Sequence, residues 1–254
     1  NYTLAIGYQM NSFGIALGTV ISEYVGLIVA FTILALSLRN TKRPLKQMWQ
    51  PPLVVKLIKV NLPLMIRTIA LHGVFVTLSI LAARLGTVEA ASIGLILVLL
   101  TTAAYALDGF AYAAEIEAGQ SLGERHFNRF IDSLKGGAVL SGLSAVIIVS
   151  IFTIFQLQIF SALTDFDAVI NQASDLMVWF TGIVLVLCWS YWLDGVFIGL
   201  TKTLDMCLTM CFSTGFGWVG GVWAFGSTSL DSLMGAFLMF SVLRTLSLAL
   251  RLPA

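Results

Sequence analysis

The sequence predicts an all-α, polytopic transmembrane helix bundle of about seven spans. Of its 254 residues 58% are hydrophobic, only 11% are charged, and long uncharged runs separate the charges. The charged share is about half that of a soluble domain, too little to cover a water-soluble surface. The composition therefore excludes a disordered chain, a secreted disulfide scaffold and a nucleic-acid partner, which would need a basic face.

The uncharged runs have the length of membrane-spanning helices. A bilayer core about 30 Å thick needs roughly 20 residues of helix. The runs are too long and too uniformly apolar for barrel strands, and backbone groups in lipid must pair within their own segment. We predict six full spans and a seventh that contains Arg244, at about 15–38, 60–84, 90–118, 136–160, 174–200, 206–226 and 229–250.

The basic residues predict the orientation and a domain boundary. The segment 39–59 carries six basic residues and no acidic one, whereas the alternate loops are poor in Lys and Arg. The positive-inside bias then places this segment and the C-terminus in the cytoplasm. With Pro44, Pro51 and Pro52, the segment is interpreted as an interfacial loop between bundle 1–38 and bundle 60–254.

Six ionisable residues lie at predicted membrane depth. An ionised side chain there costs roughly 2.5–3.5 kcal/mol on insertion scales, so each needs a partner, a wet cavity or a function. We interpret three of them, Arg67, Glu23 and Arg244, as structural counter-charges, with Arg244 snorkelling toward the interface. The other three, Asp108, Glu115 and Asp194, are candidate functional residues.

The third predicted span places two acids and a phenol on one face. Asp108, Tyr112 and Glu115 follow the spacing i, i+4 and i+7, whereas Glu117 points elsewhere. This face is suited to binding a cation or relaying a proton. The alternative is that Asp108 or Glu115 simply neutralises Arg67 on the preceding span.

Asp194 on the fifth span has aromatic neighbours in sequence and no neighbouring cation. A desolvated acid of this kind is suited to taking up and releasing protons; the alternative is a buried acid held by a backbone or hydroxyl donor. The candidate apolar wall of a cavity consists of Tyr105, Tyr112, Tyr191 and Trp189. Such aromatics also occur as ordinary packed or lipid-facing residues. We predict no metal site, because no His or carboxylate joins Cys207 and Cys211 on their helix face.

Three stretches resemble the multidrug and toxic compound extrusion (MATE) family, in its DNA-damage-inducible (DinF-like) branch. They are GTVISEY at 18–24, YALDGFAYAAE at 105–115 running on to GQSLG at 119–123, and LDGVFIG at 193–199 followed by TKT. The resemblance implies a twelve-helix fold in two six-helix lobes. Residues 1–38 would end the first lobe and 60–254 would form the second. The chain is thus expected to be a fragment whose partner is the missing N-terminal lobe.

The resemblance also implies a function. It is that of a cation-coupled antiporter of the bacterial inner membrane, not an enzyme, which exports amphipathic or cationic compounds by alternating access. It needs no cofactor beyond the coupling ion, H⁺ or Na⁺. The proton-titrating Asp residues of the DinF-like branch lie largely in the missing lobe, so Asp194, Asp108 and Glu115 are candidate coupling residues because of their predicted membrane depth. Asp194 is placed like an acid on helix ten of the sodium-driven branch, but Arg67 stands where that branch has a Glu, which argues against Na⁺. Replacing Asp194 with Asn is expected to abolish export without unfolding the protein.

Three other interpretations stay open. A flippase for a lipid-linked oligosaccharide would need a wide basic cavity for a pyrophosphate. A membrane-embedded enzyme of the prenyl-transfer class would need paired acidic motifs that hold Mg²⁺. A structural subunit would tolerate neutral substitutions of every buried acid.

Overall fold

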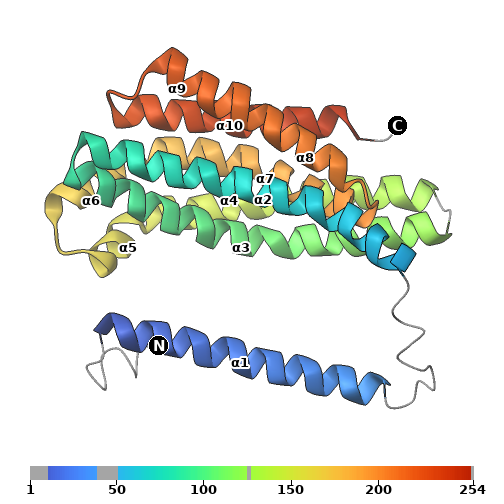
Figure 1. Ribbon diagram of the computed structural model, residues 1–254. Coiled ribbons are helices and arrows are strands. Elements are labelled where there is room, and N and C mark those ends of the chain that lie inside the picture. Colours follow the sequence, from blue (N-terminus) through green and yellow to red (C-terminus); the bar gives the residue numbers. More distant parts are fainter. Residues whose placement is uncertain (1–10, 39–50, 125–126, 253–254) are drawn as a thin grey trace. The chain divides into compact units, whose positions relative to one another are not determined.

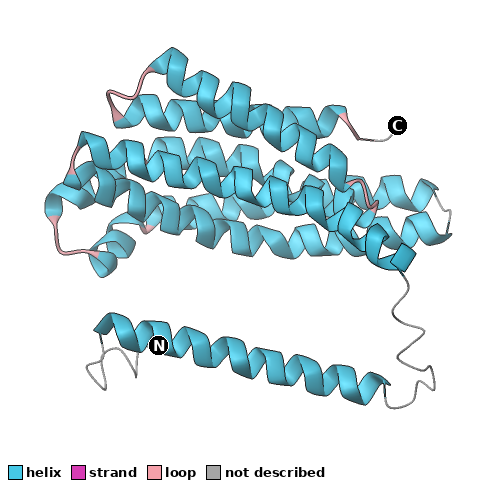
Figure 2. Cartoon of the chain, in the orientation of Figure 1, coloured by secondary structure: helices cyan, strands magenta, loops and turns pink. Residues whose placement is uncertain are grey.

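The computed structural model describes residues 11–38, 51–124 and 127–252 of the chain (Figure 1). Within these ranges every regular element is a helix, as the colouring by secondary structure shows (Figure 2). The chain divides into two compact units, Asn1–Val55 and Lys56–Ala254. Six of the described helices are long and apolar enough to cross a membrane. The predicted fold class is therefore confirmed.

The first unit contains helix α1, Asn11–Leu38. Its apolar stretch Ala16–Leu36 is long enough to cross a membrane, as predicted for 15–38. The next helix, α2, covers Pro51–Leu85, so the predicted loop is wrong after residue 50; residues 39–50 lie outside the described ranges. The reason is local: proline suits the first turn of a helix, where its missing N–H is not needed. Pro51 and Pro52 therefore start a helix.

Helix α7, Met177–Gly199, is the centre of the second unit. In its most apolar window 61% of the residues are buried, more than in any other candidate span. It packs against α3 (Thr87–Glu124), α4 (Phe127–Ile154) and α10 (Leu230–Leu250). Helix α2 adds a buried stripe at i, i+4 and i+8, formed by Val74, Leu78 and Ala82.

Two predicted spans differ from the observed helices. The span predicted at 136–160 ends at Ile154, and two short helices follow, α5 (Gln156–Leu163) and α6 (Asp167–Asp175). The span predicted at 206–226 consists of α8 (Thr203–Phe212), a π-helix η3 (Ser213–Val219) and α9 (Gly220–Phe225). Periodicity in a sequence does not distinguish π from α turns, so the sequence predicted one continuous span here.

The π-helix is joined to α2 by one side-chain hydrogen bond. The indole nitrogen Nε1 of Trp218, a residue that is 4% exposed, donates to Thr77 Oγ1 at 2.8 Å. We expect Thr77→Val to lower the free energy of unfolding by about 0.6–1 kcal/mol, because the buried donor loses its acceptor. Thermal unfolding in detergent measures this.

The matched control for that prediction is Thr102→Val. Thr102 is exposed, and its hydroxyl donates only to the Val98 carbonyl of its own helix. The control should unfold at the wild-type temperature. An equal loss of stability in both variants would mean that the bond to Trp218 contributes nothing.

Candidate functional site

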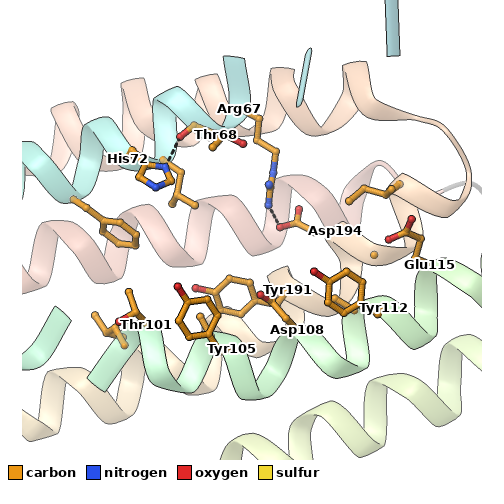
Figure 3. A pocket seen from close by; sticks show the side chains of 17 residues that line it. Arg67, Thr68, His72, Thr101, Tyr105, Asp108, Tyr112, Glu115, Tyr191 and Asp194 are labelled. Atoms are coloured by element: carbon orange, nitrogen blue, oxygen red, sulfur yellow. Dashed lines mark hydrogen bonds and ion pairs between the residues drawn. The ribbon is translucent and has the colours of Figure 1, made fainter. Parts of the chain in front are cut away.

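A cavity of about 360 Å³ lies between α2, α3 and α7 (Figure 3). It brings together seven of the residues singled out in the sequence: Arg67, Tyr105, Asp108, Tyr112, Glu115, Tyr191 and Asp194. They come from the consecutive helices α2 and α3 and from α7, which follows much later in the chain. The cavity is therefore a polar and aromatic site built at the depth of the apolar helices.

Helix α3 lines the cavity with one face. Tyr105, Asp108, Tyr112 and Glu115 all border it, as their helical spacing predicts (Figure 3). Tyr105 is 79% exposed and Tyr112 65% exposed. The aromatic part of the wall is thus open, whereas the two acids are half-buried.

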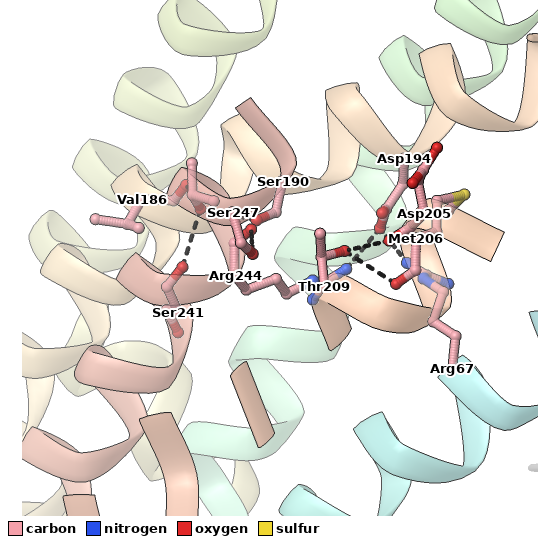
Figure 4. Close-up of polar contacts among 11 residues, drawn as sticks. Arg67, Val186, Ser190, Asp194, Asp205, Met206, Thr209, Ser241, Arg244 and Ser247 are labelled. Atoms are coloured by element: carbon pink, nitrogen blue, oxygen red, sulfur yellow. Dashed lines mark hydrogen bonds and ion pairs between the residues drawn. The ribbon is translucent and has the colours of Figure 1, made fainter. Parts of the chain in front are cut away.

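Asp194 is the acceptor for two arginines that come from different helices. Its Oδ2 accepts from Arg67 Nη2 on α2 and, at 2.5 Å, from Arg244 Nη2 on α10 (Figure 4). The side chains of Arg67, Arg244 and Asp194 are 15%, 1% and 8% exposed. Asp194 is therefore not a lone acid among aromatics, because two guanidiniums reach it across the bundle.

These contacts correct two expectations. Arg67 pairs with Asp194, not with Asp108 or Glu115. Arg244 does not snorkel: it is buried inside the bundle, with its guanidinium carbon 5.5 Å from the centroid of the Tyr191 ring. The reason is that α10 packs directly on α7, which brings Arg244 within hydrogen-bond distance of the Asp194 carboxylate.

The charges of this triad do not balance. One carboxylate faces two guanidiniums, which leaves an excess of one positive charge. Asp108 lies close enough to interact electrostatically with all three groups. Asp194 Oδ1, Arg67 Nε, and Arg244 Nε and Nη1 are buried without a hydrogen-bond partner among the described residues. The excess positive charge therefore lies beside a cavity that Asp108 also lines.

Trp189 is not among the described residues that line this cavity. Trp189 is 39% exposed and its ring lies against Gly142 of α4. It precedes Tyr191 by two residues, about 200° around the helix, so the two cannot share a wall. The expectation that Trp189 lines the cavity is wrong. Glu23 lies on α1, in the other unit, where it is exposed.

Helix α2 contributes residues that the sequence reading did not assign to the site. Thr68 and His72 line the cavity beside Arg67, and His72 Nδ1 lies 2.9 Å from the Thr68 carbonyl oxygen. Thr68 and His72 are four positions apart and share a helical face, but His72 lies five positions after Arg67, about 140° around the helix, so spacing alone did not link it to Arg67. Among the described residues, no group of three or more His, Cys, Asp or Glu side chains is arranged to hold a metal ion.

Comparison with known proteins agrees with this architecture. The chain is 32% identical to the DNA damage-inducible protein F of Escherichia coli (strain K12), with 97% of this chain and 54% of that protein aligned. The chain thus spans about half the length of this curated relative. Its fold is similar to the crystal structure of the eukaryotic MATE transporter AtDTX14, with a TM-score of 0.81 and 15% identity over 98% of this chain and 57% of that one. Residues 63–223 match the MatE family model, and the chain therefore belongs to the MatE family, as a DinF-like member.

Proposed function

We propose that this chain forms part of a proton-coupled antiporter that exports amphipathic or cationic compounds across a bacterial inner membrane by alternating access. One observation carries the proposal: a cavity at the depth of the apolar helices combines three carboxylates with exposed tyrosines. Membership of the MatE family supports a transport role rather than an enzymatic one. The C-terminus is proposed to be cytoplasmic, from the basic residues.

The cavity wall suits a cation that also has apolar surface. Carboxylates attract the charge, and the ring faces of Tyr105, Tyr112 and Tyr191 add cation–π attraction and apolar contact. In alternating access, such a site opens to one side of the membrane at a time, and a coupling ion biases one conformation. Three acids and one arginine among the described lining residues do not favour a pyrophosphate, as a flippase would require.

The acids of the cavity are proposed to have different roles. Asp194 already holds two guanidiniums, so an incoming cation would compete with Arg67 for it. Asp108 and Glu115 have no ion pair among the described residues, which makes them the better candidates for exchanging protons. A sodium ion would need several oxygen ligands and would meet the positive charge of Arg67. These arguments favour H⁺ as the coupling ion.

The proposal predicts that Asp108→Asn and Glu115→Gln each lower efflux of a cationic dye such as ethidium by about tenfold or more, since a charged contact is worth about 1.5–3 kcal/mol. Efflux is measured in cells that express the whole protein at matched levels. The control is Asp165→Asn, which neutralises an exposed acid in the loop between α5 and α6. Wild-type efflux in both cavity variants would contradict the proposal.

A further inference from the structure

A second hollow lies on the other side of α3. It has a volume of about 280 Å³ and is formed by α3 and α4 with α7 behind them. On α3 it is lined by Phe110, Ala113 and Glu117. At about 100° per residue these positions lie opposite the face of Asp108 and Glu115. The second hollow is therefore separate from the cavity of acids and tyrosines.

An indole N–H faces this hollow without an acceptor. Trp192 lines it and is 7% exposed. A Cβ added to Gly137, which also lines the hollow, would lie 2.7 Å from Trp192 Nε1, so the indole edge packs against this glycine and leaves no room for a larger residue. No described residue accepts a hydrogen bond from it. Because an indole N–H in apolar surroundings ordinarily finds a partner, an oxygen acceptor that enters the hollow is expected here.

The same hollow also contains a hydrogen-bond acceptor, in contrast to the indole donor. Glu117 is a carboxylate without an ion pair among the described residues. The remaining wall is apolar and mostly small, with Ala113, Ala114 and Gly136 among its members. The surrounding surface of α3 and α4 is exposed and apolar, including Ile116 and Val139. In a membrane-spanning bundle, such a surface is in contact with acyl chains.

We propose that this hollow binds a phospholipid with a primary-amine headgroup, of the phosphatidylethanolamine class. The ammonium group would donate to the Glu117 carboxylate, and a phosphate or ester oxygen would accept from Trp192 Nε1. An acyl chain would follow the small residues between α3 and α4. The indole donor and the carboxylate acceptor of the hollow thus match the phosphate or ester oxygen and the ammonium group of one lipid. A glycerol headgroup offers Glu117 only uncharged hydroxyl donors, and a quaternary ammonium offers it no hydrogen-bond donor.

The first test needs no variant. The purified whole protein is incubated with phosphatidylethanolamine, its mono- and dimethyl derivatives, phosphatidylcholine and phosphatidylglycerol, and bound lipid is counted by native mass spectrometry. We expect binding to fall as N–H donors are removed, by about tenfold between ethanolamine and choline, the low end for a charged hydrogen bond. Equal binding across this series, or a preference for phosphatidylglycerol, would overturn the proposal.

Two variants then assign the contacts. Glu117→Gln should remove the preference for ethanolamine over choline, whereas Glu89→Gln, at the other end of the same helix, should keep it. Trp192→Phe keeps the apolar ring and removes the N–H, so it should weaken binding of all the ester phospholipids to a similar degree. Unfolding temperatures are measured alongside. A folded Glu117→Gln variant that keeps the full preference would refute the assignment of Glu117.

Discussion

Replacing Asp194 with asparagine is expected to lower the free energy of unfolding by about 3–5 kcal/mol, the cost of leaving buried charge without its partner. The carboxylate is the common acceptor of Arg67 and Arg244, and both guanidiniums are largely buried. An amide at this position leaves both positive charges uncompensated. Thermal unfolding of the purified protein in detergent measures the loss.

Paired substitutions separate charge from packing. Adding Arg244→Gln to Asp194→Asn removes one of the uncompensated charges and should restore part of the stability. The double variant should therefore lose less stability than the sum of the losses of the two single variants. Arg67→Gln alone should cost less than Arg244→Gln alone, because Arg67 is 15% exposed and Arg244 only 1%. If Asp194→Asn unfolds at the wild-type temperature, the triad does not stabilise the fold.

This stability cost changes how an efflux assay of Asp194→Asn is interpreted. The sequence suggested a lone acid whose removal would abolish export and leave the fold intact. The structure places Asp194 in a three-helix ion cluster, so lost export could follow from misfolding. Asp108 and Glu115, which have no ion pair among the described residues, are therefore the cleaner positions for testing coupling.

The second large effect is expected at Gly195, where α7 meets the backbone of α3. A Cβ there would lie 2.8 Å from Ala111 Cα, and still closer to the Ala111 carbonyl oxygen. Backbone of a neighbouring helix gives way less easily than a side chain. We expect Gly195→Ala to cost about 1–3 kcal/mol of stability, the usual range for overpacking. Unfolding temperature and the yield of folded protein report it.

A glycine on the same helix serves as the control for Gly195. A Cβ at Gly182 would be in ordinary contact with Leu238 Cδ1 at 3.8 Å. Gly182→Ala should therefore be neutral, or slightly stabilising because alanine favours the helix. Because α3 carries Asp108 and α7 carries Asp194, pushing these helices apart should also widen the cavity. Equal stability of the two variants would mean that the close approach at Gly195 is not needed.

Local patterns were enough to predict much of the fold and part of the site. Runs of uncharged apolar residues predicted the long helices, because lipid requires backbone groups to pair within their own segment. Helical spacing placed Asp108, Tyr112 and Glu115 on one face, and they line one cavity. The same spacing separates Trp189 from Tyr191 but does not link His72 to Arg67, which lie about 140° apart on their helix.

The sequence by itself determined that the chain is a bundle of apolar helices and which residues share a face on each one, because both follow from short-range periodicity. Only the tertiary structure decided that Asp194 forms ion pairs with Arg67 of α2 and Arg244 of α10, and that Trp192 and Glu117 line a second hollow. Periodicity gives the direction of a side chain around its own axis but does not say which helix packs against that face. The partner of a buried charge depends on that packing, and here the paired residues lie 50 and 127 positions apart in the chain.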